Sequence, residues 1–164
     1  MKAFNIFIST LIFFISSLAN ANEKIKFSLD WKFEGPSAIF LTSKERGYYK
    51  SSGLDVTIDS GKGSRDAIPK VASGTYPLGF ADINSVIKFL DQNPKAKVKA
   101  IMMVYDRPPF AIIGRKSLGV VKPKDLEGKI LGAPAPDGAY AQWKSFVKAN
   151  NINCLLYTSP SPRD

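Results

Sequence analysis

The chain has 164 residues, 23 of them basic and 14 acidic, for a formal net charge of +9. Its lysines are scattered singly, without arginine clusters or interleaved aromatic residues, so the charge is typical of a solvated surface and not of a nucleic-acid groove. The chain has no histidine and its one cysteine is Cys154, so a metal site would need carboxylates alone, and none is predicted.

The first residues have the pattern of a secretory signal peptide. Lys2 precedes an apolar run over residues 4–18, and residues 19–21 (Ala-Asn-Ala) supply a small-x-small cleavage site. The alternative is a transmembrane anchor, but the run is shorter than the ~20 apolar residues that a span needs. We therefore expect cleavage after Ala21, a mature chain that begins at Asn22 and a periplasmic location.

The last segment, residues 154–164, reads CLLYTSPSPRD. A DNA string that resembles the transposon-end adapter of sequencing libraries translates to these residues, so we predict an artefact that lies outside the fold. A genuine Pro/Ser-rich tail is the alternative. If the prediction holds, the natural part of the chain has no cysteine, which excludes a lipoprotein anchor. We would also expect the natural reading frame to continue beyond residue 153.

Residues 25–58 predict one βαβ unit. Apolar residues alternate over 25–31 and again over 54–58, and a Gly-Pro-Ser turn with a short apolar segment lies between them. The turn follows the first strand at its carboxyl end, where open α/β sheets bind ligands.

The alternation of strands and helices continues to about residue 150 and predicts a mostly parallel sheet. A loop over residues 60–64 leads into a helix with its N-cap at or very near Asp66, because Pro69 is tolerated only in the first helical turn. The other predicted elements are a strand over 76–81, a helix from 83 to 92, strands over 98–104 and 110–114, a turn at 123–126, a strand over 129–133 and a final helix after a loop at 134–138.

Short motifs in a fixed order carry a family resemblance: LDWKFEGPS from Leu29, GYY at 47–49, GLDV at 53–56 and DLEGK at 125–129. From about residue 24 to 153 the chain resembles solute-binding proteins of the nitrate, taurine and thiamine-pyrimidine type, which feed ABC importers. The resemblance implies an α/β, two-lobed periplasmic binding protein type II fold, truncated to most of lobe 1 plus the start of lobe 2.

The resemblance also implies boundaries and partners. Residues 22–115 would form the first part of lobe 1, and residues 116–153 the hinge crossing and the start of lobe 2. The protein would be a monomer that holds a small-molecule ligand between its lobes and delivers it to an ABC permease in the inner membrane. No cofactor and no catalytic residue are expected.

Polar and aromatic residues near the ends of the predicted strands are the candidate ligand-binding residues, since such ends gather at one rim of a parallel sheet. The eight candidates are Trp31, Ser37, Ser64, Asp82, Asn84, Asp106, Asp137 and Ala139.

Each candidate has a competing structural role. Trp31 would stack on a flat ligand or pack in the core. Ser64, in a Gly-x-Gly-Ser loop that lacks the spacing of a nucleotide P-loop, would donate to a ligand or belong to a plain connection. Asp82 and Asn84 can cap a helix as well as bind. Asp106 would hold a ligand amine or pair with the neighbouring arginine.

The loop before the last helix, which contains Asp137 and Ala139, suggests a different ligand chemistry. The amino end of a helix suits a carboxylate, sulfonate or phosphate group. The sequence leaves the ligand open among pyrimidines, sulfonates, nitrate and other small solutes.

Two other functions are disfavoured. The resembling superfamily includes a thiamine-pyrimidine synthase that holds pyridoxal phosphate on a lysine and consumes one of its own histidines. Those positions fall on Ala81 and Ser85 here, and neither side chain can do that chemistry. An effector-sensing domain of a transcription regulator would need a DNA-binding helix-turn-helix in front, where the signal peptide stands.

Overall fold

A three-stranded parallel sheet organises the larger part of the molecule. The computed structural model describes residues 22–153 and 158–159; the predicted signal peptide and most of the predicted adapter tail lie outside them. β1 (Glu23–Ser28) lies between β2 (Leu54–Asp59) and β3 (Leu78–Gly79) and runs parallel to both. The mixed α/β class with a parallel sheet is confirmed.

The first βαβ unit forms as its alternating apolar residues predict. Ile25 lies opposite Val56 and Phe27 opposite Ile58 in the β1–β2 register. The connection contains η1 (Gly35–Ser37), α2 (Ala38–Glu45) and α3 (Tyr48–Ser51). The two α-helices are separated by Gly47, whose positive φ of 73° suits glycine. Phe40 of α2 packs on the sheet, with ring centres 4.9 Å from Phe27 and 5.2 Å from Phe80.

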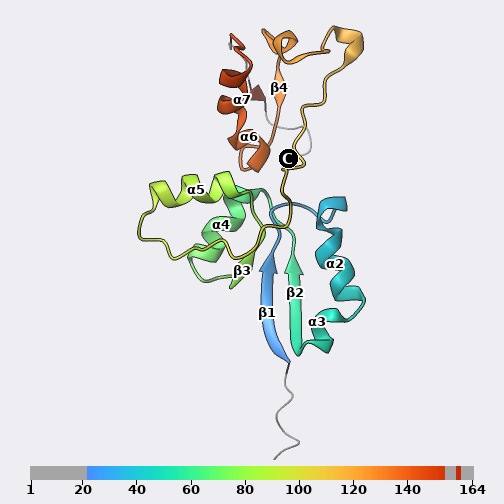
Figure 1. The fold of residues 1–164 in the computed structure, drawn as a ribbon, viewed down its shortest axis with the longest axis vertical. Helices are drawn as coiled ribbons and strands as arrows, with labels where there is room; N and C mark the ends of the chain where they lie inside the picture. Colours follow the sequence, from blue (N-terminus) through green and yellow to red (C-terminus); the bar gives the residue numbers. More distant parts are fainter. Residues whose placement is uncertain (1–21, 154–157, 160–164) are drawn as a thin grey trace, which may run out of the picture.

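Two further helices lie on the other side of the sheet from α2 and α3 (Figure 1). α5 (Ile83–Gln92) begins after Asp82 and ends at Asn93, as predicted. α4 (Ser64–Ala72) starts earlier than predicted, because Gly63 and not Asp66 is its N-cap. Pro69 consequently lies inside the helix, and Asp66 instead forms an (i, i+4) ion pair of 2.6 Å with Lys70.

The predicted strands over 98–104 and 110–114 are wrong. Residues 97–115 have no regular secondary structure, and Ile101 is 80% and Ile113 95% exposed. Apolar, β-branched residues favour strands only where a sheet edge supplies the ladder partners. The segment touches the larger part through Tyr105, whose ring meets Phe80 edge-on at 6.0 Å and whose hydroxyl donates to the Pro36 carbonyl.

A smaller unit, residues 116–153 together with β5 (Thr158–Ser159), follows this segment. It contains η2 (Lys116–Leu118), η3 (Pro123–Leu126), β4 (Leu131–Gly132), α6 (Gly138–Ala141) and α7 (Trp143–Ala149). The predicted final helix is therefore broken at Gln142 into two. β4 pairs in parallel with β5, so Thr158 and Ser159 are part of the fold, contrary to the prediction that residues 154–164 lie outside it.

The buried apolar residues explain how the larger part holds together. Leu29 is fully buried, and Ala67 and Ile68 of α4 are 1% and 3% exposed, so this core lies between the sheet and α4. Figure 1 shows the arrowheads of β1 and β2 pointing toward the smaller unit. The carboxyl ends of the strands therefore face α6 and β4. Among the described residues, no helix is long and apolar enough to cross a membrane.

Candidate ligand-binding site

The loop Gly61–Ser64 follows β2 in the larger part and contacts the smaller unit. Gly61 donates its N–H to the Trp31 carbonyl at 2.9 Å, and a Cβ at Gly61 would lie only 2.2 Å from the Leu29 carbonyl oxygen. Gly63 has φ = 140°, and a Cβ there would lie 2.2 Å from the carbonyl oxygen of Pro136. Only glycine allows these backbones to approach so closely.

Ser64 and Asp82 are brought together at this junction. The Ser64 side chain is buried, and its Oγ accepts the backbone N–H of Asp82 at 2.9 Å. Gly138 of α6 covers them, since a Cβ there would lie 3.0 Å from both Ser64 Oγ and Asp82 Cβ. Gln142 adds a second link, because its Nε2 donates to Asp82 Oδ1 at 3.2 Å.

Asp82 and Asp137 both cap helices. Asp82 Oδ2 accepts the Ser85 backbone N–H at 2.8 Å, and Asp137 Oδ1 accepts the Ala139 N–H at 2.9 Å. Asn84 is exposed and reaches Asp82 Oδ1 at 3.3 Å. The structure thus brings five of the eight candidates to one place: Ser64, Asp82, Asn84, Asp137 and Ala139.

Asp30 is a residue of this junction that sequence reasoning missed. Its pKa is raised from 3.8 to about 6, mainly by burial and also by the negative charges of Asp137 and Asp82, while the backbone N–H groups of Asp30 and Trp31 lower it. The available signal was its position directly before Trp31, at the carboxyl end of the first strand.

The side chains of the other three candidates, Trp31, Ser37 and Asp106, form no hydrogen bond with this group among the described residues. Ser37 is buried but closes its own turn: its Oγ donates to the Glu34 carbonyl at 2.8 Å and accepts the Glu34 N–H at 3.1 Å. Trp31 is partly exposed, with the Lys32 ammonium 6.0 Å from its ring centre. Asp106 is exposed.

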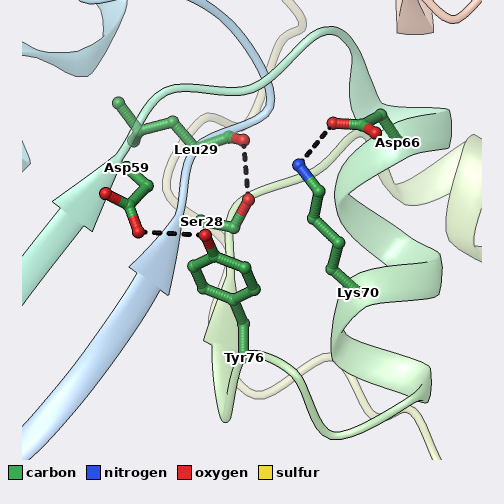
Figure 2. Close-up of polar contacts among 6 residues, drawn as sticks. All are labelled: Ser28, Leu29, Asp59, Asp66, Lys70 and Tyr76. Carbon is green, nitrogen blue, oxygen red and sulfur yellow. Dashed lines mark hydrogen bonds and ion pairs between the residues drawn. The ribbon is translucent and has the colours of Figure 1, made fainter.

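A polar network supports the end of β2 beside this loop (Figure 2). The Tyr76 hydroxyl donates to Asp59 Oδ2 at 2.9 Å. This bond is the main reason that the pKa of Tyr76 is raised. The Lys70 ammonium, already paired with Asp66, lies 5.9 Å from the Tyr76 ring centre. These contacts connect β2, α4 and the turn before β3, and so help to position the loop that carries Gly61 and Ser64.

Two cavities in the described part of the chain lie away from the junction. A shallow groove of about 590 Å³ lies beside Pro69 and Phe89, and a hollow of about 150 Å³ lies beside Ile112 and Leu126. Neither cavity is lined by Ser64, Asp82, Asp137 or Gln142, which meet at the strand ends. Within the described residues, no group of three or more His, Cys, Asp or Glu side chains is arranged to hold a metal ion.

Open parallel α/β sheets bind ligands at the carboxyl ends of their strands, and here these ends meet a second unit through polar groups. The profile of the family described as NMT1/THI5 like matches residues 36–158. The chain therefore belongs to this family, and the resemblance seen in its motifs is confirmed.

One relative supports a solute-binding role. The riboflavin-binding protein RibY of Chloroflexus aurantiacus is 26% identical over 102 residues, which are 62% of this chain and 29% of that relative. The chain thus spans less than a third of the length of the relative. No solved structure matches.

Proposed function

We propose that the protein is the periplasmic solute-binding component of an ABC importer. It captures a small solute between two lobes and presents it, as a monomer, to a permease in the inner membrane. The observation that carries the proposal is the junction itself. Gly63, Ser64 and Asp82 at the strand ends of the larger part meet the loop and helix that contain Asp137 and Gly138 of the smaller unit.

The geometry supports a closure mechanism without a covalent step. Arg65 donates its backbone N–H to Pro136 O at 3.2 Å and its Nη1 to Ala135 O at 3.1 Å, and Gln142 bonds Asp82. These few polar contacts can break when the units separate and form again when they close. A solute that binds both faces shifts the population toward the closed form, which the permease would recognise.

The enzyme alternative is weaker. Ala81 and Ser85 occupy the positions where the related synthase has its lysine and histidine, so neither a Schiff base nor the histidine-consuming step can occur there. We therefore propose a binding protein without catalytic residues and without a cofactor.

The test uses the protein expressed from its complete gene, with secretion checked by cell fractionation. Thermal unfolding is measured with amines, pyrimidines, sulfonates, nitrate and riboflavin, the last because of the relative's name. A solute at about 100 times its Kd stabilises the folded protein by about 2.7 kcal/mol, which raises Tm measurably. If no small solute raises Tm and the protein stays in the cytoplasm, the receptor proposal fails.

Trp31 provides a second test of the site. We expect Trp31→Ala to weaken binding of the identified solute roughly ten- to a thousandfold, as loss of a stacking aromatic does. Tm should stay nearly unchanged, because the side chain is partly exposed. A large loss of stability with unaltered affinity would place Trp31 in the core.

A further inference from the structure

The loop that begins at Trp31 has few contacts of its own. It leads from the carboxyl end of β1 to α2 through residues 32–36, all of which are exposed. The Ser37 hydroxyl closes the turn with Glu34 from within. On the side of β1, the Trp31 carbonyl accepts the Gly61 N–H at 2.9 Å. Because no buried side chain anchors residues 32–36, the position of this loop depends on its hydrogen bonds with neighbouring segments.

Tyr105 supplies such a hydrogen bond near the other end of the loop. Its hydroxyl donates to the Pro36 carbonyl at 2.5 Å, between residues 69 positions apart in the chain. Its half-buried ring meets Phe80 edge-on at 6.0 Å, and the Phe80 ring centre lies 5.2 Å from that of Phe40 in α2. This row of aromatic rings sets the position from which the hydroxyl reaches Pro36.

The segment that contains Tyr105 also contacts the smaller unit. Among the described residues, the bond from Tyr105 to Pro36 is the one hydrogen bond that connects residues 97–115 to the larger part. Further along the same segment, Phe110 lies against α6, where its Cζ would be 3.4 Å from a Cβ at Gly138. A single hydrogen bond therefore links the Trp31 loop to a segment that touches both units.

We propose, resting on the receptor function above, that Tyr105 is a positioning residue of the solute site. Its hydroxyl holds the loop between β1 and α2, so that the Trp31 side chain is oriented before a flat solute arrives. A loop that is already ordered loses less freedom on binding, which strengthens affinity without a contact between Tyr105 and the solute. Loss of this hydrogen bond should change the ratio of held to released loop roughly two- to tenfold.

The test follows Trp31 by ¹⁹F NMR in the full-length, solute-free protein labelled with 5-fluorotryptophan. The resonances of Trp31 and Trp143 are assigned by their loss in Trp31→Phe and Trp143→Phe. Tyr105→Phe keeps the ring that meets Phe80 and removes only the hydroxyl. We expect the Trp31 resonance to shift or split as the released population grows roughly two- to tenfold, with the Trp143 resonance and Tm nearly unchanged. Tyr48→Phe, at a tyrosine that is 54% exposed, is the matched control and should leave both resonances unchanged.

A Trp31 resonance that is the same in wild type and Tyr105→Phe would overturn the inference. Equal changes at Trp31 and Trp143, or a large fall in Tm, would assign Tyr105 a general structural role and also overturn it. The solute panel tests the receptor function separately. If a solute raises Tm but the Trp31 resonance does not respond to Tyr105→Phe, the protein is a receptor and only this inference fails. If no solute raises Tm, the receptor function fails, and the positioning role in a solute site fails with it even where the Trp31 resonance responds.

Discussion

Residues 23–92 and residues 97–115 are both rich in apolar side chains. The first region forms regular helices and strands, whereas the second has no regular secondary structure. In the first region, alternating residues form strands that pair and helices that cover them, and Leu29 is fully buried. In the second, Ile101, Met102 and Ile113 are 80%, 72% and 95% exposed. The difference shows that an apolar segment becomes a strand only when a partner edge satisfies its backbone groups.

The largest expected effect is the loss of stability when a buried apolar side chain of the first region is truncated, compared with an exposed one of the second. Leu29→Ala should lower the free energy of unfolding by about 2–5 kcal/mol, because it leaves a cavity in the core. Ile101→Ala should change it by less than about 0.5 kcal/mol, as for other exposed positions. Denaturant unfolding of both variants measures the difference. If Ile101→Ala lowers the free energy of unfolding as much as Leu29→Ala does, residues 98–104 are buried in the intact protein.

Substitution of two glycines distinguishes the effect of losing a contact between the two units from the effect of backbone strain alone. Gly63 and Gly74 both have positive φ, 140° and 77°, but only Gly63 faces a neighbour, Pro136. Gly74→Ala should cost about 1 kcal/mol from conformation alone. Gly63→Ala should cost more, about 2–4 kcal/mol, and should also weaken solute binding because closure is blocked. Equal losses of stability and equal affinities would mean that the contact of Gly63 with Pro136 is dispensable.

Asp30 should make stability depend on pH. Its pKa rises from 3.8 to about 6 on folding, so the folded state binds its proton more tightly than the unfolded state. The stabilisation is therefore present below pH 3.8 and is lost as pH rises through 6. Asp30→Asn should be more stable than wild type at pH 8 by up to about 2 kcal/mol, allowing for partial exposure, and the gain should disappear near pH 4.

Urea unfolding of both proteins between pH 4 and pH 8 measures this effect. Asp55→Asn, on an exposed position of β2, controls for the loss of one negative charge. A gain that does not vary with pH would contradict the burial of the Asp30 carboxyl group.

The smallest expected effect concerns the network beside β2. Tyr76→Phe removes the hydroxyl that bonds Asp59 and should cost about 0.5–1.5 kcal/mol. Tyr48→Phe is the matched control, because Tyr48 is 54% exposed and its hydroxyl forms no hydrogen bond among the described residues. If both variants unfold at the same denaturant concentration as wild type, the Tyr76–Asp59 bond does not hold the end of β2.

The sequence by itself determined the local elements and the family. The βαβ unit, the Asp82 cap and the end of α5 at Asn93 follow from alternation, capping chemistry and turn residues, which act over a few neighbouring positions. The ordered motifs were enough to indicate the NMT1/THI5-like family. The structure brings five of the eight site candidates to one place, because strand ends are predictable from the same local patterns, and their role in ligand binding stays a prediction.

Only the tertiary structure decided which segments pair and which side chains meet. Residues 98–104 and 110–114 have the composition of strands but no ladder partner. α4 begins at Ser64 because the close approach of Gly63 to Pro136 fixes the loop before it. The charge of Asp137, more than 100 positions away in the chain, contributes to the raised pKa of Asp30, because the fold brings the two residues near each other. Such contacts depend on distances between segments far apart in the chain, which no local spacing in the sequence encodes, so only the fold brings Ser64, Asp82 and Asp137 to one place.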